Sequence, residues 1–302
     1  MQYHQLSDAT ARQLLANNLV LDDVRRLIAV ALDEDLKNGH DVTTNSTVSA
    51  NQRSTGVFAT RMKGCIAGLD VAVAVLEMVC GSENIVVTKH VDDCARVKPG
   101  DKLMSVDAPT RGLLTAERTA LNLLCQLSGV ATATSEWADA LVGTGAQVRD
   151  TRKTTPGMRA LEKYAVRCGG GVNHRMSLSD AALVKDNHIA AAGGVAEAFA
   201  LVRAAAPNIA IEIEVDTLEQ LGVALSAGAD LVLLDNMAPA MLKEAVGITG
   251  GHRISTGKDV ILEASGGLTL ESVAAVGATG VRYISVGALT HSAKVLDIGL
   301  DL

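Results

Sequence analysis

Aromatic residues are scarce in this 302-residue chain: they make up 2% of it, as one Trp, three Tyr and two Phe. The core must therefore be built from Ala, Val, Leu and Ile. Together with 28 Gly, this composition favours closely packed strand–helix units over an all-β sandwich. Hydrophobic residues reach 48% and charged residues 20%, so a packed core is expected and extensive disorder is not.

Other absences exclude whole classes of protein. The formal net charge of −7 provides no broadly basic surface for nucleic acid. No apolar run reaches the length of a membrane span, and the N-terminal segment MQYHQLSDATARQLL lacks the basic-then-apolar order of a secretory signal. The five cysteines form no CxxC pair, which is typical of reduced thiols and not of a disulfide framework or a zinc site. We therefore expect a cytoplasmic protein that binds neither nucleic acid nor membranes.

The first part of the chain mixes helical and strand patterns and predicts an α+β region with an antiparallel sheet. The expected elements lie at residues 21–35 (helix), 54–61 (strand), 69–80 (helix), 83–91 (strand) and 97–108 (turn and strand). A long helical stretch at 113–142, which Gly129 can break, leads into the second part.

From residue 146 onwards, short apolar runs alternate with helical patterns. The runs are AQVRDT, AALVKDN, IAIEIEV, LVLLDN, VILEASGG and RYISVGAL. Strands that alternate with helices imply a parallel sheet with right-handed crossovers. Because no glycine-rich dinucleotide fingerprint is present, we predict the α/β class, with an incomplete, TIM-like α/β barrel in preference to a doubly wound sheet.

Nearly every one of these runs ends in a charged residue or a glycine turn. In chain order, the ends carry Arg152 and Lys153, Lys185, Glu214, Asp235, Ser265-Gly266-Gly267, and Gly287. The active site of a βα barrel forms at the carboxyl ends of its strands. Charges that converge there are costly to bury unless a charged ligand lies between them. The pattern therefore predicts a site for a charged ligand.

The residue types at these ends indicate what the ligand contains. Residues 149–186 carry a net charge of +4 in a chain of −7, and Arg and Lys are suited to carboxylates and phosphates. Glu214 and Asp235 can hold Mg²⁺ or sugar hydroxyls. The turns Ser265-Gly266-Gly267 and Val286-Gly287-Ala288, expected to open onto helix N-termini, can bind a phosphate through backbone N–H groups. Together they predict a ligand with carboxylates, a ribose and phosphates.

The segment DTRKTTPGMRALEKYAVRCGGGVNHRMSLSDAALVKDNHI (150–189) resembles the signature of the quinolinate phosphoribosyltransferases, also called carboxylating nicotinate-nucleotide pyrophosphorylases. DTRKTTPG, GGGVNHR and KDNHI occur in the order and spacing of that family. Further similar segments cover most of the chain: EDLKNGHDVTT (34–44), ERTALNLL (117–124), EIEVD (212–216), LLDN (233–236), EASGG (263–267) and SVGALTHS (285–292).

The resemblance implies a pentosyltransferase of de novo NAD biosynthesis. With Mg²⁺, it would convert quinolinate and phosphoribosyl pyrophosphate to nicotinate mononucleotide, pyrophosphate and CO2. The implied fold has an N-terminal α+β sandwich domain over residues 1–125, joined by the C-terminal tail at 291–302, and a seven-stranded open α/β barrel over 126–290. The implied assembly is a homodimer, or a higher oligomer, in which the sandwich of one subunit covers the barrel mouth of the other and the active sites are shared.

The same resemblance assigns roles to individual residues by motif match. Arg118 would reach the partner's site and contact quinolinate. The quinolinate carboxylates would be held by Arg152, His174 and Arg175. Four residues would carry the catalysis: Lys153 and Lys185 at the pyrophosphate and the substrate carboxylate, and Glu214 and Asp235 at the ribose hydroxyls and the hydrated Mg²⁺. The remaining substrate-binding residues are Thr154 and, around the 5′-phosphate, Ser265, Gly266, Gly267, Val286, Gly287, Ala288 and His291.

Three other functions stay open at this point. The first is a phosphoribosyltransferase that acts on a monocarboxylate such as nicotinate, although the number of Arg and Lys residues favours two carboxylates. The second is a Schiff-base aldolase that uses Lys185, and the third is a nucleotide-binding protein without catalysis. Glu212 and Glu214 point to the same side of their strand, and Glu214 is preferred because it is nearer the strand end. Glu263 is expected at the rim, where it would orient other residues.

Overall fold

The computed structural model describes residues 3–36 and 39–302. Lys37 and Asn38 of the segment 34–44 lie outside the described residues. The chain divides into two compact units. Unit 1 comprises Met1–Ser135, Thr154–Gly170 and Thr290–Leu302, and unit 2 comprises Glu136–Lys153 and Gly171–Leu289.

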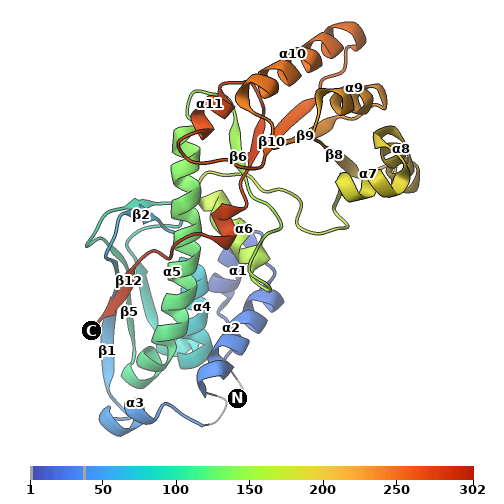
Figure 1. Ribbon diagram of the computed structural model, residues 1–302. Coiled ribbons are helices and arrows are strands. Elements are labelled where there is room, and N and C mark those ends of the chain that lie inside the picture. The colour runs from blue at the N-terminus through green and yellow to red at the C-terminus, as the bar shows by residue number, and fades with distance from the viewer. Residues whose placement is uncertain (1–2, 37–38) are drawn as a thin grey trace. The chain divides into compact units, whose positions relative to one another are not determined.

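Unit 1 is built on an antiparallel sheet with the strand order β12-β1-β5-β3 among the described residues. Its strands are β1 (Arg53–Thr60), β3 (Val86–Lys89), β5 (Lys102–Pro109) and β12 (Ile298–Asp301), and a short pair is formed by β2 (Gly64–Cys65) and β4 (Arg96–Val97). The C-terminal strand β12 pairs with β1, with Ile298 opposite Thr60. The last residues of the chain thus complete a sheet whose other strands lie between residues 53 and 109 (Figure 1).

The helices of unit 1 are α1 (Asp8–Ala16), α2 (Leu21–Leu36), α3 (Val42–Thr47), α4 (Leu69–Cys80), the 3₁₀ turn η1 (Ser82–Asn84), α5 (Thr110–Ala140) and α6 (Arg159–Cys168). Of these, α2, α4 and α5 lie where the sequence predicts helices, and the others were not predicted. Helix α4 is apolar on nearly all sides because it packs against α1, α2 and β5. Its buried Glu77 accepts hydrogen bonds from the hydroxyls of Ser7 (2.7 Å) and Thr10 (2.8 Å).

Helix α5 runs without interruption from Thr110 to Ala140, so the break considered at Gly129 does not occur. A Cβ atom at Gly129 would lie 2.2 Å from the carbonyl oxygen of Lys294. The glycine therefore allows the C-terminal tail to pass close to the helix backbone, which is a tertiary requirement that local sequence does not reveal.

Unit 2 contains a parallel sheet with the strand order β6-β11-β10-β9-β8-β7 among the described residues. The strands are β6 (Gln147–Arg149), β7 (Ala181–Val184), β8 (Ala210–Val215), β9 (Leu231–Asp235), β10 (Ile261–Ser265) and β11 (Tyr283–Ser285). They correspond to the apolar runs identified in the sequence. Beyond β6, Val172 forms a single parallel bridge with Arg149, so one bridging residue stands where a seventh strand was expected. The predicted α/β class, with its open parallel sheet and an α+β N-terminal part, is confirmed.

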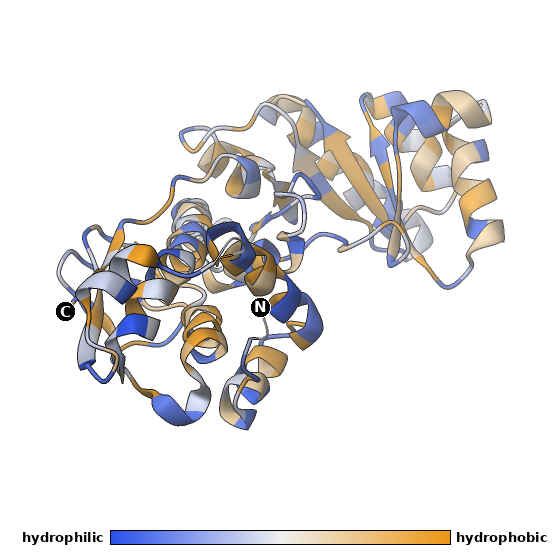
Figure 2. Cartoon of the chain, turned by 90° about the horizontal axis from the view of Figure 1, so that it is seen from below, coloured by the Kyte–Doolittle hydropathy of each residue, from blue (hydrophilic) through white to orange (hydrophobic). Residues whose placement is uncertain are grey.

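Helices connect most strands of unit 2. They are α7 (Asp186–Ala192), α8 (Val195–Ala205), α9 (Leu218–Ser226), α10 (Pro239–Thr256) and α11 (Val273–Gly277). The short helix α12 (Ala288–His291) follows the last strand, β11, and ends in unit 1. Helix α10 extends through the polar stretch after Gly250 to Thr256 and is followed by Gly257, whose φ of 75° is typical of the residue that terminates a helix. The strands are largely hydrophobic along their length (Figure 2), as expected where helices cover a parallel sheet.

No single helix of the described residues is long and apolar enough to cross a membrane. Helices α7 and α8 meet that criterion only as a pair, by length and composition, with a bend of 90° between them.

Candidate active site

Unit 2 has a pocket of about 380 Å³ at the carboxyl ends of its parallel strands. Ten of the residues that line it lie in, or closely follow, the six strands: Thr151, Arg152, Lys153, Leu183, Lys185, Glu214, Leu233, Asp235, Ser265 and Ser285. The other two, His174 and Arg175, follow the bridging residue Val172. Eight of these residues were singled out from the sequence. The strand ends therefore meet around one cavity, because parallel neighbours finish at the same edge of a sheet.

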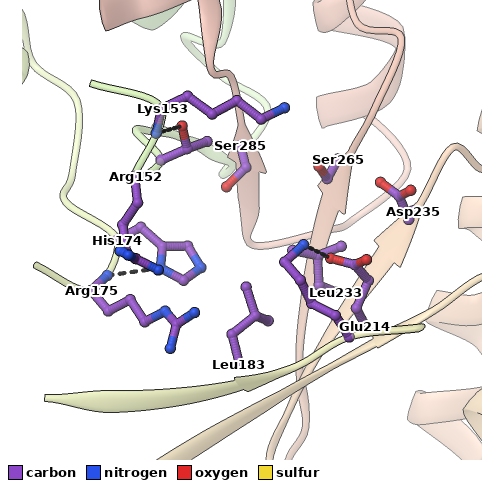
Figure 3. Close-up of a pocket in the computed structure, with 12 residues that line it drawn as sticks. Arg152, Lys153, His174, Arg175, Leu183, Glu214, Leu233, Asp235, Ser265 and Ser285 are labelled. Carbon is purple, nitrogen blue, oxygen red and sulfur yellow. Dashed lines mark hydrogen bonds and ion pairs between the residues drawn. The ribbon is translucent and has the colours of Figure 1, made fainter. Parts of the chain in front are cut away.

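The pocket is divided by charge. Figure 3 shows Arg152, His174 and Arg175 on one side, which we call the basic half, and Glu214 and Asp235 on the opposite side, which we call the acidic half. An ion pair joins Lys185 to Glu214. A ligand that fills this space would meet cations at one end and carboxylates at the other.

The basic half is assembled by a buried carboxylate. Asp150 directly follows β6 and is fully buried. It accepts hydrogen bonds from the side-chain amide of Asn173 (2.6 Å) and from the backbone N–H of His174 (2.8 Å). Because Asp150 ties the 173–175 segment to the end of β6, Arg152 and Arg175 are brought to the same wall of the pocket.

The two arginines of the basic half affect one another. Burial, and then the positive charge of Arg152, lower the pKa of Arg175. The Nη1 atom of Arg175 donates a hydrogen bond to the carbonyl oxygen of Ala181 at 2.9 Å, which fixes the direction of the guanidinium. Two neighbouring cations, Arg152 and Arg175, favour the binding of an anion between them.

The acidic half places two carboxylates on adjacent strands. Glu214 lies near the end of β8 with its side chain 12% exposed, and Asp235 is the last residue of β9. Asp235 also accepts a hydrogen bond from the side chain of Asn236 at 2.7 Å. Both groups offer oxygen atoms toward the cavity, which suits a sugar hydroxyl or a hydrated Mg²⁺.

The first glycine turn follows β10 directly. Gly266 and Gly267 have φ angles of 87° and 62°, and a Cβ atom at Gly266 would lie 2.1 Å from Oδ1 of Asn236. The expectation that this turn opens onto a helix is wrong, since α11 begins only at Val273. The second turn does lead into a helix, because α12 begins at Ala288, immediately after Gly287.

Several predicted residues are placed elsewhere. Arg118, Thr154 and His291 belong to unit 1. The basic residues Arg159, Lys163 and Arg167 of the signature segment lie in α6 of unit 1, where Lys163 is fully buried. The basic segment 149–186 is therefore shared between the two units, and only part of its charge lines the pocket.

The sequence interpretation missed the buried groups beneath the pocket. Glu263, expected at the rim, is fully buried; it pairs with Arg149 and accepts a hydrogen bond from Ser285. Burial, and then the negative charge of Glu212, raise the pKa of Glu263 to about 7. A glutamate inside an otherwise apolar strand, as in IAIEIEV and VILEASGG, is the signal that could have located them.

Family models match most of the chain, from residue 41 onwards. The model of the quinolinate phosphoribosyl transferase N-terminal domain matches residues 41–128, and that of the C-terminal domain matches residues 130–301. The chain belongs to the quinolinate phosphoribosyl transferase family. The family membership and the transferase function predicted from the signature segment are thus confirmed.

Individual members of the quinolinate phosphoribosyl transferase family agree with this assignment. The nicotinate-nucleotide pyrophosphorylase [carboxylating] of Mycobacterium leprae is 53% identical over 281 residues, which cover 93% of this chain and 98% of that protein. The mitochondrial quinolinate phosphoribosyltransferase [decarboxylating] 2b of Nicotiana tabacum is 39% identical over 299 residues, which cover 93% of this chain and 82% of that protein. The solved nicotinate-nucleotide pyrophosphorylase of Francisella tularensis superposes with a TM-score of 0.88 at 38% identity, covering 94% and 98% of the two chains.

Proposed function

We propose that this enzyme transfers the phosphoribosyl group of phosphoribosyl pyrophosphate to the ring nitrogen of quinolinate, with loss of pyrophosphate and CO2, and so forms nicotinate mononucleotide for NAD biosynthesis. The observation that carries this proposal is the division of one pocket into a basic half and an acidic half (Figure 3). The names of the Mycobacterium leprae and Nicotiana tabacum relatives describe the same chemistry.

The basic half suits the pyridine substrate. Quinolinate is a dianion with carboxylates on neighbouring ring carbons. Arg152 and Arg175 would neutralise these two groups, with Lys185 beside them, and would direct the ring nitrogen toward the ribose. The two negative charges of a dicarboxylate also balance the two positive charges of these arginines.

The acidic half suits the sugar phosphate. Glu214 and Asp235 would hold the ribose hydroxyls and a Mg²⁺ ion that arrives with the pyrophosphate, since carboxylate oxygens are the ligands that Mg²⁺ prefers. The ion, when bound, would neutralise negative charge on the pyrophosphate. The backbone of residues 265–267 and 286–288 would bind the 5′-phosphate.

Positioning and charge stabilisation account for most of the reaction. When the bond from ribose C1 to pyrophosphate breaks, Lys153 would stabilise the charge that develops on the leaving group. The ring nitrogen bonds to C1 and becomes a pyridinium. Loss of the 2-carboxylate as CO2 leaves an electron pair on carbon 2, which the adjacent positive nitrogen stabilises. A proton then bonds to carbon 2 in place of the carboxylate.

The assembly completes this proposal. We propose a homodimer with shared sites, in which Arg118, exposed on α5, contacts the quinolinate of the partner subunit; Thr154 and His291 are proposed as further substrate contacts. All five cysteines are free thiols, which supports a reducing compartment such as the cytoplasm.

Mixing inactive Arg118→Ala and Arg152→Ala proteins should restore activity, because a mixed dimer regains one intact site. An absence of recovery would count against a shared site.

The test of the substrate compares quinolinate with nicotinate, using pyrophosphate release in the presence of phosphoribosyl pyrophosphate and Mg²⁺. We expect kcat/KM for nicotinate to be at least about 100-fold lower, because one carboxylate-binding group would be left unpaired. Equal turnover of both acids would instead support a transferase for monocarboxylates.

A further inference from the structure

Beneath the pocket of unit 2, four side chains form a buried network. The Nε2 atom of His174 lies 2.7 Å from Oε2 of Glu212 and 3.9 Å from Oε1 of Glu263. Arg149 pairs with Glu263, and its Nη1 atom lies 3.8 Å from Oε1 of Glu212. The exposed fractions of these side chains are between 0% and 15%, so the network is shielded from water.

The hydrogen bonds of His174 define its tautomer. Its Nδ1 atom lies 2.7 Å from the backbone nitrogen of Arg175 and accepts a hydrogen bond from that N–H. A backbone amide can only donate, so Nδ1 carries no proton. The ring proton must therefore be on Nε2, where it is donated to Glu212. His174 is thus a neutral imidazole that links the buried carboxylate of Glu212 to the backbone of Arg175. Figure 3 shows its contact with Arg175.

A metal centre is a poorer explanation of this geometry. The ligand atoms of His174, Glu212 and Glu263 lie within 4.8 Å of one another, a spacing that an ion could bridge. The guanidinium of Arg149, however, already supplies a cation to both carboxylates. The Nε2 atom of His174 must also keep its proton, whereas a metal ligand must present a lone pair.

We propose that Glu212 is a positioning residue of the quinolinate site. Its carboxylate accepts a hydrogen bond from Nε2–H of His174 and so turns Nδ1 toward Arg175, which holds the backbone of Arg175 at the wall of the basic half. Arg175 lies at the boundary between a buried and an exposed part of its loop: His174 is 8% exposed, whereas residues 178–180 are exposed. Its backbone therefore has little packing on one side and needs this hydrogen bond to stay in place. The inference rests on the proposed function, since it assigns Arg175 to a quinolinate carboxylate.

The neighbouring acid on the same strand provides a matched control. Glu212 and Glu214 are two residues apart on β8 and point to the same side. Glu214 lines the pocket and pairs with Lys185, whereas Glu212 lies beneath and contacts His174. Loss of Glu212 should therefore affect quinolinate, and loss of Glu214 should affect phosphoribosyl pyrophosphate.

Steady-state kinetics of the full-length protein test this division. In Glu212→Ala, we expect the KM for quinolinate to rise about 10-fold or more, with the KM for phosphoribosyl pyrophosphate unchanged within about 2-fold. In Glu214→Ala, we expect the KM for phosphoribosyl pyrophosphate to rise and the KM for quinolinate to stay unchanged within about 2-fold. In Glu212→Gln, the KM for quinolinate should stay within about 3-fold of the wild-type value, because the amide oxygen can still accept a hydrogen bond from Nε2–H.

A folded Glu212→Ala protein with an unchanged KM for quinolinate would overturn the proposal, as would a Glu212→Gln protein as impaired as Glu212→Ala. Wild-type protein that does not consume quinolinate would instead overturn the proposed function. If Glu212→Ala does not fold, nitrogen-15 NMR of the wild-type histidines decides. The resonance lost in His174→Asn should report a neutral ring protonated at Nε2, and a ring protonated at Nδ1 contradicts the proposed chain.

Discussion

Lys185 and Glu214 form an ion pair across neighbouring strands, with Lys185 directly after β7 and Glu214 near the end of β8. The pair connects the basic half of the pocket to the acidic half. Because the ammonium group of Lys185 is held by a carboxylate, in the proposed reaction it would serve as a fixed positive charge between the carboxylate of quinolinate and the phosphates of the second substrate.

This arrangement predicts that Lys185 does not act as a Schiff-base nucleophile. A protonated amine paired with a carboxylate has no lone pair for attack on a carbonyl. Treatment with carbonyl compounds and borohydride should leave Lys185 unmodified in peptide mass spectrometry. A reduced adduct on Lys185 would favour an aldolase.

Removal of Arg152 should weaken the binding of the quinolinate transition state. Truncating a charge-assisted pair of this kind costs about 2–4 kcal/mol, so kcat/KM for quinolinate should fall about 30- to 1000-fold in Arg152→Ala. Arg253→Ala is a suitable control, because Arg253 lies on α10 with its side chain 63% exposed. Near-normal kinetics of Arg152→Ala would remove Arg152 from the site.

The glycine turn after β10 should not tolerate a side chain. In Gly266→Ala, the new Cβ atom would collide with Asn236, and the φ of 87° is strained for alanine. We expect the KM for phosphoribosyl pyrophosphate to rise about 10-fold or more if the turn binds the 5′-phosphate. Gly251→Ala on α10 has open space at the same atom and should leave kinetics unaltered. Equal KM values in both variants would exclude the turn from phosphate binding.

The buried Glu263 should make stability depend on pH. A carboxyl whose pKa is raised from 4.5 to about 7 keeps a proton in the folded protein that the unfolded chain loses. The free energy of unfolding should therefore fall as the pH rises from about 4.5 to about 7, by at most about 1.4 kcal/mol per pH unit for this group. The groups that face it are Glu212, Arg149, His174 and Ser285.

Urea denaturation at pH 5, 6 and 7 measures this dependence. Glu263→Gln imitates the protonated acid and should show a shallower decline than the wild type. A smaller slope should remain, because burial also raises the pKa of Glu212. Identical slopes in the two proteins would contradict a raised pKa at Glu263.

The sequence was sufficient to predict the parallel sheet and most of the pocket. An apolar run that ends in a charged residue is a local pattern, and a parallel sheet necessarily brings such ends together. Lys185, Glu214 and Asp235 could be located in this way. The signature segment added His174 and Arg175, which lie in a loop that carries no regular periodicity.

The remaining features depend on contacts between distant segments. The burial of Glu212 and Glu263 follows from the pairing of β8, β9 and β10 and from the position of Arg149. The close passage of Lys294 past Gly129 depends on a tail more than 160 residues away in the chain. The passage of Lys294 past Gly129 has no local signature, so the sequence interpretation considered a break there. The apolar runs around Glu212 and Glu263 indicate burial but do not identify the partners of these acids, so the sequence interpretation placed Glu263 at the rim.

The most direct test of the central claim is the release of labelled CO2 from quinolinate that carries the label in its 2-carboxylate. With phosphoribosyl pyrophosphate and Mg²⁺ present, we predict one labelled CO2 for each pyrophosphate released, and none when phosphoribosyl pyrophosphate is omitted. Pyrophosphate released without CO2, or CO2 released without phosphoribosyl pyrophosphate, would contradict a reaction in which the pyridinium formed in this pocket drives the decarboxylation.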